Sequence, residues 1–399
     1  MKSIKVVVFV ITCIGIGLGI LIGIGYYFFT QNGDPNEVTG VQDGSSAILP
    51  EALKQLGANS TKAALDATLE TIDIVVETED LSDIEKKYAL LSKAYIQLVT
   101  RTEDVGQTPT ETRALLKTIY DSSSDQRDFA NRRINDYALF GFLYSFSEGC
   151  FVPGRIKHLP EHVVVKHFNF VPAQQNESAI PRISQKETFL GYISLLNDEA
   201  EFDIFKNDKR FKSQSAYIKA MYLDSYRDQI SDEEKKRLVF EIENDINEFE
   251  RGEYIMSTSP ASTQIIITTP FQISFAKYVI EHVTTGVHNF TGLSDTYTKI
   301  GNLDVDPVFK SITQTFLKIY QLGAMYRANA SPDEVRDTVS ELSLIIKSNP
   351  DNQPLIRGYL NYGLSEAGKW FTLKNDFFKL TETSPELDSQ LKSVGIKGY

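Results

Sequence analysis

The stretch LGAMYRANASPDEVRDTVSELSLIIKSNP, residues 322–350, contains the clearest helix signals in the chain. Ser331 precedes Glu334 by three residues, the spacing at which each side chain caps the backbone N–H of the other at a helix start. Pro332 takes the first helical position, where the missing N–H of proline has no cost. Pro350 closes the segment, because proline cannot continue a helix. The stretch therefore predicts two helices joined by a short turn.

The same start signal recurs along the chain, each time as a Ser or Thr followed three residues later by Glu. It occurs at Ser82 and Glu85, Thr108 and Glu111, Ser184 and Glu187, and Ser231 and Glu234. Apolar residues then follow at three- and four-residue steps, as expected for one buried face of a helix. We expect roughly ten to twelve helices beyond residue 50, joined mostly by short turns.

Leu322, Gly323 and Tyr326 resemble the first-helix core of a tetratricopeptide repeat, in which a Leu-Gly pair precedes a Tyr. Leu342 and Ile345 stand where the second helix of the repeat has its core residues, although both are larger than the usual Ala. The segment Leu91-Ser-Lys-Ala-Tyr95 matches the first helix in part, and the period of about 34 residues is not sustained. The resemblance implies an α-solenoid whose concave face holds a peptide or another protein, and the alternative is an irregular helical bundle.

The predicted fold class is therefore all-α: an irregular, tetratricopeptide-like α-solenoid or a helical-hairpin bundle behind one N-terminal transmembrane helix. Two stretches interrupt the helical pattern. Residues 149–183 are rich in Gly and Pro around the β-prone run Val163–Phe170, and residues 255–275 contain Ile265–Thr269 between two prolines. We expect each stretch to form an irregular insertion, either a long loop or a short extended segment.

Residues 6–29 form a run of 24 residues without a charge. As a helix this run would be roughly 36 Å long, enough to cross a hydrocarbon core of about 30 Å. Lys2 and Lys5 precede it, whereas only acidic charges follow it closely, so the positive-inside rule places the N-terminus in the cytoplasm. The run is too long for the apolar core of a cleaved signal peptide. We therefore predict a single-pass protein of the cell membrane with an extracytoplasmic body.

This interpretation divides the chain into three parts. Residues 1–30 form the cytoplasmic tip and the membrane anchor, which contacts lipid. Residues 31–50 form a flexible tether, because Gly, Pro and Ser interrupt any periodic pattern there. Residues 51–399 form the helical body, which contains the two irregular insertions.

Composition excludes several classes of protein. The chain has 399 residues and a formal net charge of −12, so nucleic acid is not an expected partner. Its two cysteines cannot supply a disulfide scaffold or a cysteine-ligated metal cluster. It has no Gly-rich phosphate loop, dinucleotide fingerprint or serine nucleophile elbow. We therefore predict no cofactor and no enzymatic activity.

One metal motif does match in its letters. His158, Glu161 and His162 fit the pattern His-x-x-Glu-His, in which two imidazoles one helical turn apart bind zinc and the glutamate acts as general base. Pro160 lies inside the motif and disfavours helix at the residue before it, so His158 is expected outside any helix that holds His162. These three residues are candidate metal ligands, and a polar loop cluster is the alternative. His282 and His288 flank Gly286 without a third ligand, and we interpret them as helix-end residues.

Gly15, Gly19 and Gly23 recur every four residues in the predicted anchor and therefore share one face of it. Small residues at this spacing let two membrane helices approach closely, which predicts a parallel homodimer. For the whole chain, the resulting hypothesis is a scaffold that binds proteins at the cell envelope. The alternatives are an envelope enzyme, such as a metal-dependent hydrolase that uses residues 149–183, and a receptor for a small ligand.

Overall fold

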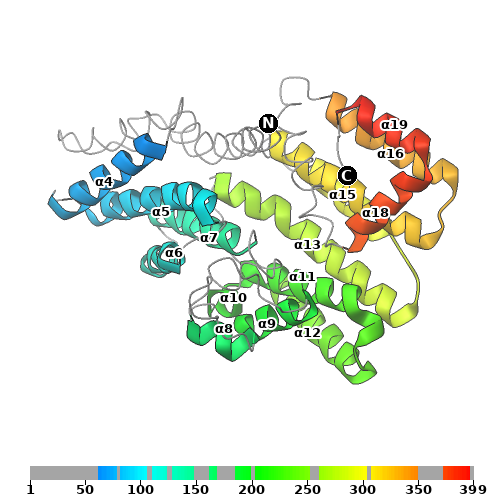
Figure 1. The fold of residues 1–399 in the computed structure, drawn as a ribbon, viewed down its shortest axis with the longest axis horizontal. Coiled ribbons are helices and arrows are strands. Elements are labelled where there is room, and N and C mark those ends of the chain that lie inside the picture. Colours follow the sequence, from blue (N-terminus) through cyan, green and yellow to red (C-terminus); the bar gives the residue numbers. More distant parts are fainter. Residues whose placement is uncertain are drawn as a thin grey trace, which may run out of the picture. The chain divides into compact units, whose positions relative to one another are not determined.

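Helices are the only regular secondary structure in the part of the chain that the structure, a computed structural model, describes (Figure 1). The prediction of an all-α chain is therefore confirmed for these residues. The described residues are 62–78, 81–105, 110–123, 128–147, 161–168, 185–198, 203–251, 260–302, 307–348 and 372–395.

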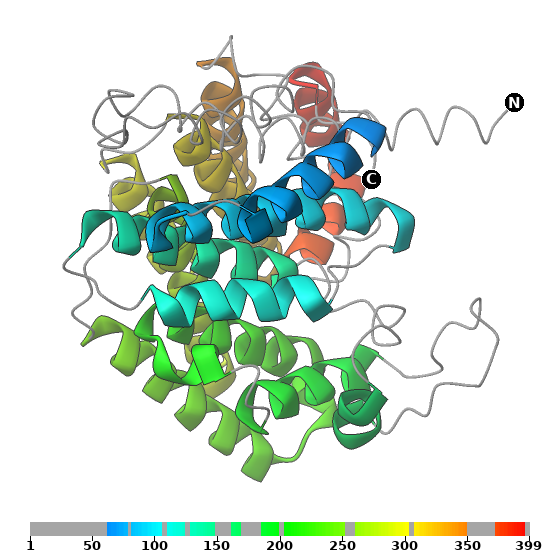
Figure 2. The ribbon, with the colours of Figure 1, turned by 90° about the vertical axis from the view of Figure 1, so that its left-hand side faces the viewer.

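The chain divides into two compact units, an N-terminal unit of residues 1–183 and 255–262 and a C-terminal unit of residues 184–254 and 263–399. In the N-terminal unit each of the helices α4 to α7 packs on the next, and α5 also packs on α7. Figure 2 turns these helices, coloured blue to cyan, toward the viewer. Their bounds, with that of α8, are α4 Lys62–Thr78, α5 Asp83–Val105, α6 Thr110–Ser122, α7 Phe129–Ser147 and α8 Glu161–Phe168.

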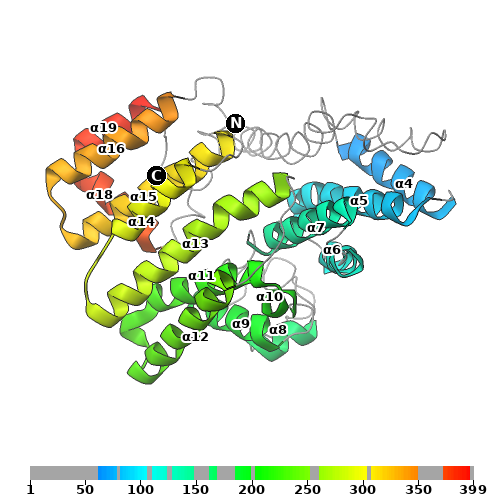
Figure 3. The same ribbon diagram turned by 180° about the vertical axis from the view of Figure 1, so that it is seen from behind.

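The C-terminal unit has two groups of helices. In one group α9, α10 and α12 pack on α11, and in the other α14, α16 and α18 pack on α15, with α19 covering α16 and α18 (Figures 1 and 3). The bounds are α9 Gln185–Asp198, α10 Asp203–Asn207, α11 Lys209–Tyr226, η4 Arg227–Gln229, α12 Asp232–Glu250, α13 Pro260–Thr285, α14 Thr291–Gly301, α15 Pro307–Ala328, α16 Pro332–Lys347, α18 Thr372–Thr383 and α19 Pro385–Ser393.

An aromatic cluster joins the two groups through α13. The ring of Phe275 in α13 lies with its centroid 5.3 Å from the ring of Tyr217 in α11 and 5.5 Å from that of Tyr320 in α15. The hydroxyl oxygens of the two tyrosines are 3.0 Å apart and hydrogen-bonded. Burial raises the pKa of Tyr217 to about 12, so this pair stays neutral in the physiological range. Each hydroxyl thus has a hydrogen-bond partner inside the core, as buried tyrosines usually do.

The predicted helix starts at Ser82, Ser231 and Ser331 are confirmed. Ser331 accepts a hydrogen bond from the backbone N–H of Glu334, whose carboxylate accepts one from the backbone N–H of Ser331. The Ser331 hydrogen bonds lower the pKa of Glu334, because they stabilise its ionised form. These starts were predictable because a capping box depends only on residues three positions apart.

The two interruptions of the helical pattern differ from expectation wherever the structure describes them. Residues from Pro260 onward belong to α13, which contains Pro270 in its interior, so the prediction of an irregular or extended segment there is wrong. The β-branched residues favour strands only weakly, and tertiary packing overrides that preference. Thr269 and Gln272 are buried, and the Gln272 side chain accepts a hydrogen bond from the Ser213 hydroxyl at 2.9 Å.

The β-prone run at Val163 is also helical, since α8 spans Glu161–Phe168. Lys166 in the last turn suits a helix, because a positive charge there interacts favourably with the helix dipole. Phe168 is buried at its end. The remainder of 149–183 lies outside the described residues.

The predicted hairpin at 322–350 forms as α15 and α16. Leu322, Leu342 and Ile345 are buried, and Asn329 makes the turn with a φ of 50°. Gly323 in α15 lies directly against the backbone of α18: a Cβ atom placed on it would come within 2.0 Å of the Leu373 carbonyl oxygen. Only glycine allows this approach of the two helices.

The predicted anchor at residues 6–29 and the tether that follows it lie outside the described residues. Within the described helices, none combines the length and the apolar character needed to cross a bilayer.

Gly323→Ala is expected to lower the free energy of unfolding by about 3 kcal/mol, because the added methyl group meets backbone that cannot rotate away. Gly292→Ala in α14 is the matched control, since no atom lies within 4 Å of its Cβ position. That change should be neutral or slightly stabilising. Thermal melts of both variants check the prediction, and equal melting temperatures would contradict it.

Candidate functional site

A buried ion-pair network centres on Arg327 in the C-terminal unit. Arg327 in α15 donates from Nη1 and Nη2 to the two carboxylate oxygens of Asp224 in α11, at 2.7 and 3.1 Å. Its Nε donates to Asp376 in α18 at 2.5 Å. The Asp224 side chain has no exposed surface. One guanidinium therefore ties three helices together with three charge-assisted hydrogen bonds.

A stacked pair of histidines lies beside this network. The imidazole rings of His282 and His288 have centroids 3.7 Å apart and an interplanar angle of 22°. The hydroxyl oxygen of Tyr278 is 2.9 Å from Nδ1 of His288. His282 is buried, and its Nδ1 has no hydrogen-bond partner among the residues that the structure describes. We call these three residues, with Asp224, Arg327 and Asp376, the Arg327 cluster.

Gly286 produces the histidine stack. It follows the last residue of α13 with a φ of 75°, and its N–H donates to the carbonyl of His282 at 2.8 Å. A residue in the left-handed region at a helix end satisfies a free carbonyl and reverses the chain. The reversal brings His288 back over the last turn of α13, where His282 lies. The two histidines are therefore more than the helix-end residues that we inferred from the sequence.

The surroundings keep both imidazoles neutral. Burial is the main cause that lowers the pKa of His282 to about 4, and the neighbouring His288 and Arg227 add to it. Burial and the positive charges of Arg327 and Arg227 likewise lower the pKa of His288. Burial raises the pKa of Tyr278 to about 12. For Arg327, burial alone would lower the pKa, but Asp224 and Asp376 outweigh it and raise the pKa, so the ion pairs persist.

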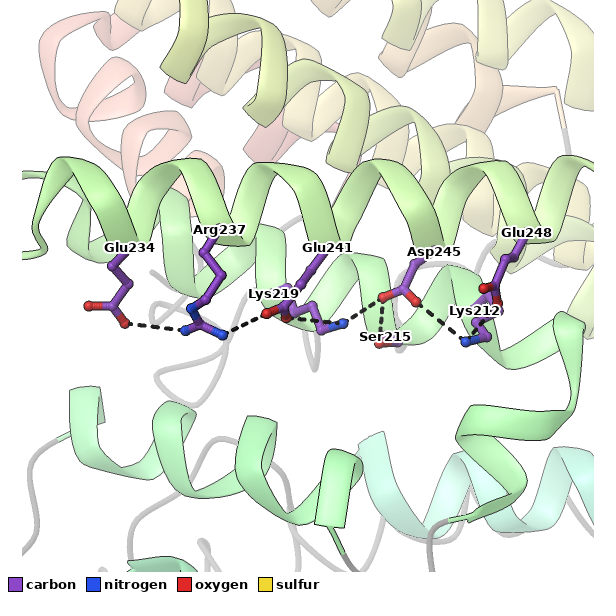
Figure 4. Close-up of polar contacts among 8 residues, drawn as sticks. All are labelled: Lys212, Ser215, Lys219, Glu234, Arg237, Glu241, Asp245 and Glu248. Atoms are coloured by element: carbon purple, nitrogen blue, oxygen red, sulfur yellow. Dashed lines mark hydrogen bonds and ion pairs between the residues drawn. The ribbon is translucent and has the colours of Figure 1, made fainter.

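A second polar feature is a row of ion pairs along the hairpin of α11 and α12 (Figure 4). At its centre Asp245 accepts hydrogen bonds from the Lys219 ammonium at 2.8 Å and from the Ser215 hydroxyl at 2.7 Å. We call this row the ionic ladder. Its members are Lys212, Ser215, Lys219, Glu234, Arg237, Glu241, Asp245 and Glu248.

The side of α12 that faces away from its buried residues exposes an aromatic ring. Leu238, Ile242 and Ile246 are buried against the unit, whereas the Phe240 side chain is 63% exposed. On α16 the Leu344 side chain is 66% exposed. Single exposed apolar residues are common on protein surfaces. Phe240 is nevertheless the aromatic member of the large apolar side chains that the described residues expose.

The predicted metal ligands His158, Glu161 and His162 stay a prediction, because the structure does not describe all three. Glu161 and His162 lie in the first turn of α8, and His158 lies outside the described residues. Within the ranges described, no group of three His, Cys, Asp or Glu side chains is placed to hold a metal ion. The glycines of the predicted membrane stripe, Gly15, Gly19 and Gly23, also lie outside the described residues.

Comparison with known protein families, with curated proteins and with solved structures finds no match to this chain. The sites described above are therefore interpreted from their geometry alone. The Arg327 cluster places two neutral imidazoles beside a guanidinium that is paired with two carboxylates. The surface residues Phe240 and Leu344 are suited to contacts with other proteins.

Arg327→Met is expected to lower the free energy of unfolding by about 3–5 kcal/mol, because it leaves the buried Asp224 carboxylate without its counter-charge. Combining it with Asp224→Asn should recover part of the loss. Arg336→Met is the matched control, since Arg336 pairs with Asp333 at the surface and such pairs contribute less than about 1 kcal/mol. Urea denaturation of the full-length chain in mild detergent measures all three, and equal effects of the two arginine changes would contradict the prediction.

The histidine pair predicts a loss of stability in mild acid. Because the pKa of folded His282 is about 4 and its unfolded value is about 6.5, the unfolded chain binds a proton that the folded chain excludes as the pH falls. The contribution of neutral His282 to the free energy of unfolding is therefore fully present above about pH 6.5. Between pH 6.5 and 5 the free energy of unfolding should fall by about 2 kcal/mol. His282→Gln stays neutral and should flatten this dependence. Parallel stability curves for the two proteins would contradict the assignment.

Proposed function

We propose that this chain is a membrane-anchored scaffold whose helical body lies outside the cytoplasm and binds other proteins at the cell envelope. The apolar run at residues 6–29, preceded by Lys2 and Lys5, supports the anchor and its orientation. The succession of capped helical hairpins supports a helical body that can present a binding surface to other proteins. In a tetratricopeptide-like solenoid, such hairpins would stack so that successive helices form one extended binding surface.

The observation that carries this proposal is the exposure of Phe240 and Leu344. Each lies on the second helix of a hairpin, α12 after α11 and α16 after α15, and each is surrounded by polar neighbours. Large apolar side chains that gain burial on binding supply most of the affinity of protein interfaces, with a polar rim around them. The two side chains are thus suited to act as anchors for partners.

The test is photo-crosslinking of the full-length chain in its native membrane. A photoreactive amino acid in place of Leu344 should give discrete, reproducible adducts with other proteins. The same amino acid in place of Lys392, an exposed residue of α19, is the control and should give few. Protease added to intact cells should degrade the adducts, because the body is proposed to lie outside.

Two results would contradict the proposal. Adducts that are equally abundant from both positions would mean that Leu344 is an ordinary surface residue. Complete protection of the body from external protease while the membrane is intact would refute the orientation.

A further inference from the structure

Two buried nitrogen atoms beside the Arg327 cluster have no hydrogen-bond partner among the residues that the structure describes. They are Nδ1 of His282 and Nη1 of Arg227. The His282 side chain is only 7% exposed, so bulk solvent does not hydrate its ring. Native proteins leave few buried polar atoms unpaired, so two such atoms close to each other call for a functional explanation.

The fold brings these two residues to the same part of the C-terminal unit. Arg227 begins η4 directly after α11, whose last turn carries Asp224, the partner of Arg327. His282 lies in the last turn of α13, under the ring of His288. Burial is the main cause that lowers the pKa of both imidazoles, and the positive charge of Arg227 adds to it, which requires Arg227 to lie near them. We call Arg227, His282 and His288 the Arg227 site.

The charges of the neighbouring carboxylates are already matched. Asp224 and Asp376 are the acidic groups that act on the two imidazoles, and both hold the Arg327 guanidinium. Asp376 also pairs with Lys379 at 3.3 Å. Two negative charges therefore face two positive ones, and the charge of Arg227 is additional to this balance.

Two further acids near the site are directed elsewhere. Oδ2 of Asp228 is 3.8 Å from Nε of Arg227, but the Asp228 side chain is 89% exposed, so solvent weakens this pair. Glu281, which precedes His282 in α13, accepts a hydrogen bond from the Asn289 amide at 3.1 Å. Nη1 of Arg227 is thus a charged donor for which the described residues supply no acceptor.

The site is accessible from one side. The Arg227 side chain is 34% exposed and His288 is half-buried, whereas His282 lies deeper in the unit. A ligand from solution therefore meets the guanidinium first and reaches the buried imidazole behind it.

We propose that the Arg227 site binds the carboxylate group of a ligand, one oxygen accepting a hydrogen bond from Nη1 of Arg227 and the other from Nδ1–H of His282. Two oxygens match two unpaired nitrogens, and one negative charge matches one guanidinium that lacks a buried counter-charge. A neutral imidazole can carry its proton on Nδ1 and donate it, and hydrogen bonds from arginine to a carboxylate are among the strong ones.

A phosphate dianion fits this site less well. It would need a second positive charge, which the imidazoles do not supply, because burial lowers the pKa of His282 to about 4 and keeps the ring neutral at pH 7. The proposal goes beyond the proposed function and depends neither on the membrane anchor nor on Leu344.

The experiment uses the full-length chain in mild detergent, labelled with ¹⁵N in histidine alone. The chain has 5 histidines, so the ring signals are few, and His282→Gln identifies the signal of His282. Acetate is the probe, and it replaces chloride stepwise at pH 7 and constant ionic strength. The ring nitrogen signal of His282 should shift to a plateau, with a dissociation constant of about 1–10 mM for so small a ligand.

Arg227→Met should weaken acetate binding at least about tenfold, because it removes both the charge and the donor. Arg227→Lys keeps the charge and should weaken binding less. Arg336→Met is the matched control, since Arg336 lies on the surface of α16, and its dissociation constant should stay within about twofold of the unchanged chain. Thermal melts check that each variant is folded.

Acetyl-alanyl-alanine distinguishes two sources of the carboxylate. A higher affinity than that of acetate assigns the site to the end of a peptide, and an equal or lower affinity assigns it to a small organic acid. The proposal is overturned if the His282 signal does not reach a plateau, if Arg227→Met binds acetate as well as the unchanged chain, or if inorganic phosphate binds more tightly than acetate at pH 7.

Discussion

The C-terminal unit depends on the charge of Arg327. Its guanidinium, on α15, is the counter-ion of two carboxylates, Asp224 on α11 and Asp376 on α18. Burying such a carboxylate alone costs several kcal/mol, and a hydrophobic replacement of the whole network could stabilise the fold equally well. What the network supplies is geometric restriction. A bidentate pair fixes both the distance and the orientation between α11 and α15, whereas apolar packing would accept several registers.

The charge of Arg327 also affects the protonation of the two histidines beside the network. The histidines beside it are held neutral by burial and by nearby arginines, so they add no positive charge next to Arg327 and Arg227. On α12, by contrast, the carboxylates of Asp245 and Glu248 pair with lysines of α11, along the ionic ladder. The unit thus pairs buried charges in two places, around the Arg327 guanidinium and along the hairpin of α11 and α12.

The sequence predicted the features that depend on near neighbours. The capped starts at Ser82, Ser231 and Ser331 were predictable because both partners of a capping box lie within one turn. The Arg327 cluster was not, because Asp224 is 103 residues from Arg327 and only the packing of distant helices joins them. The helical state of residues 260–269 was missed for a related reason: the local preference of Ile and Thr for strands is small, and burial elsewhere in the fold decides. A signal that could have been used was the spacing of His282 and His288 around a glycine, which fits a helix that ends and reverses.

The turn at Gly286 imposes a constraint of handedness. No atom lies within 4 Å of the position where a Cβ would stand, so there is room for a small side chain at this position. The obstacle is the positive φ, at which an L-residue clashes with its own backbone while a residue of the opposite chirality would not. Substitution at this position is therefore limited by stereochemistry and not by volume. A change that no packing argument would flag could still move His288 away from His282 and separate the imidazole stack from the helix that carries it.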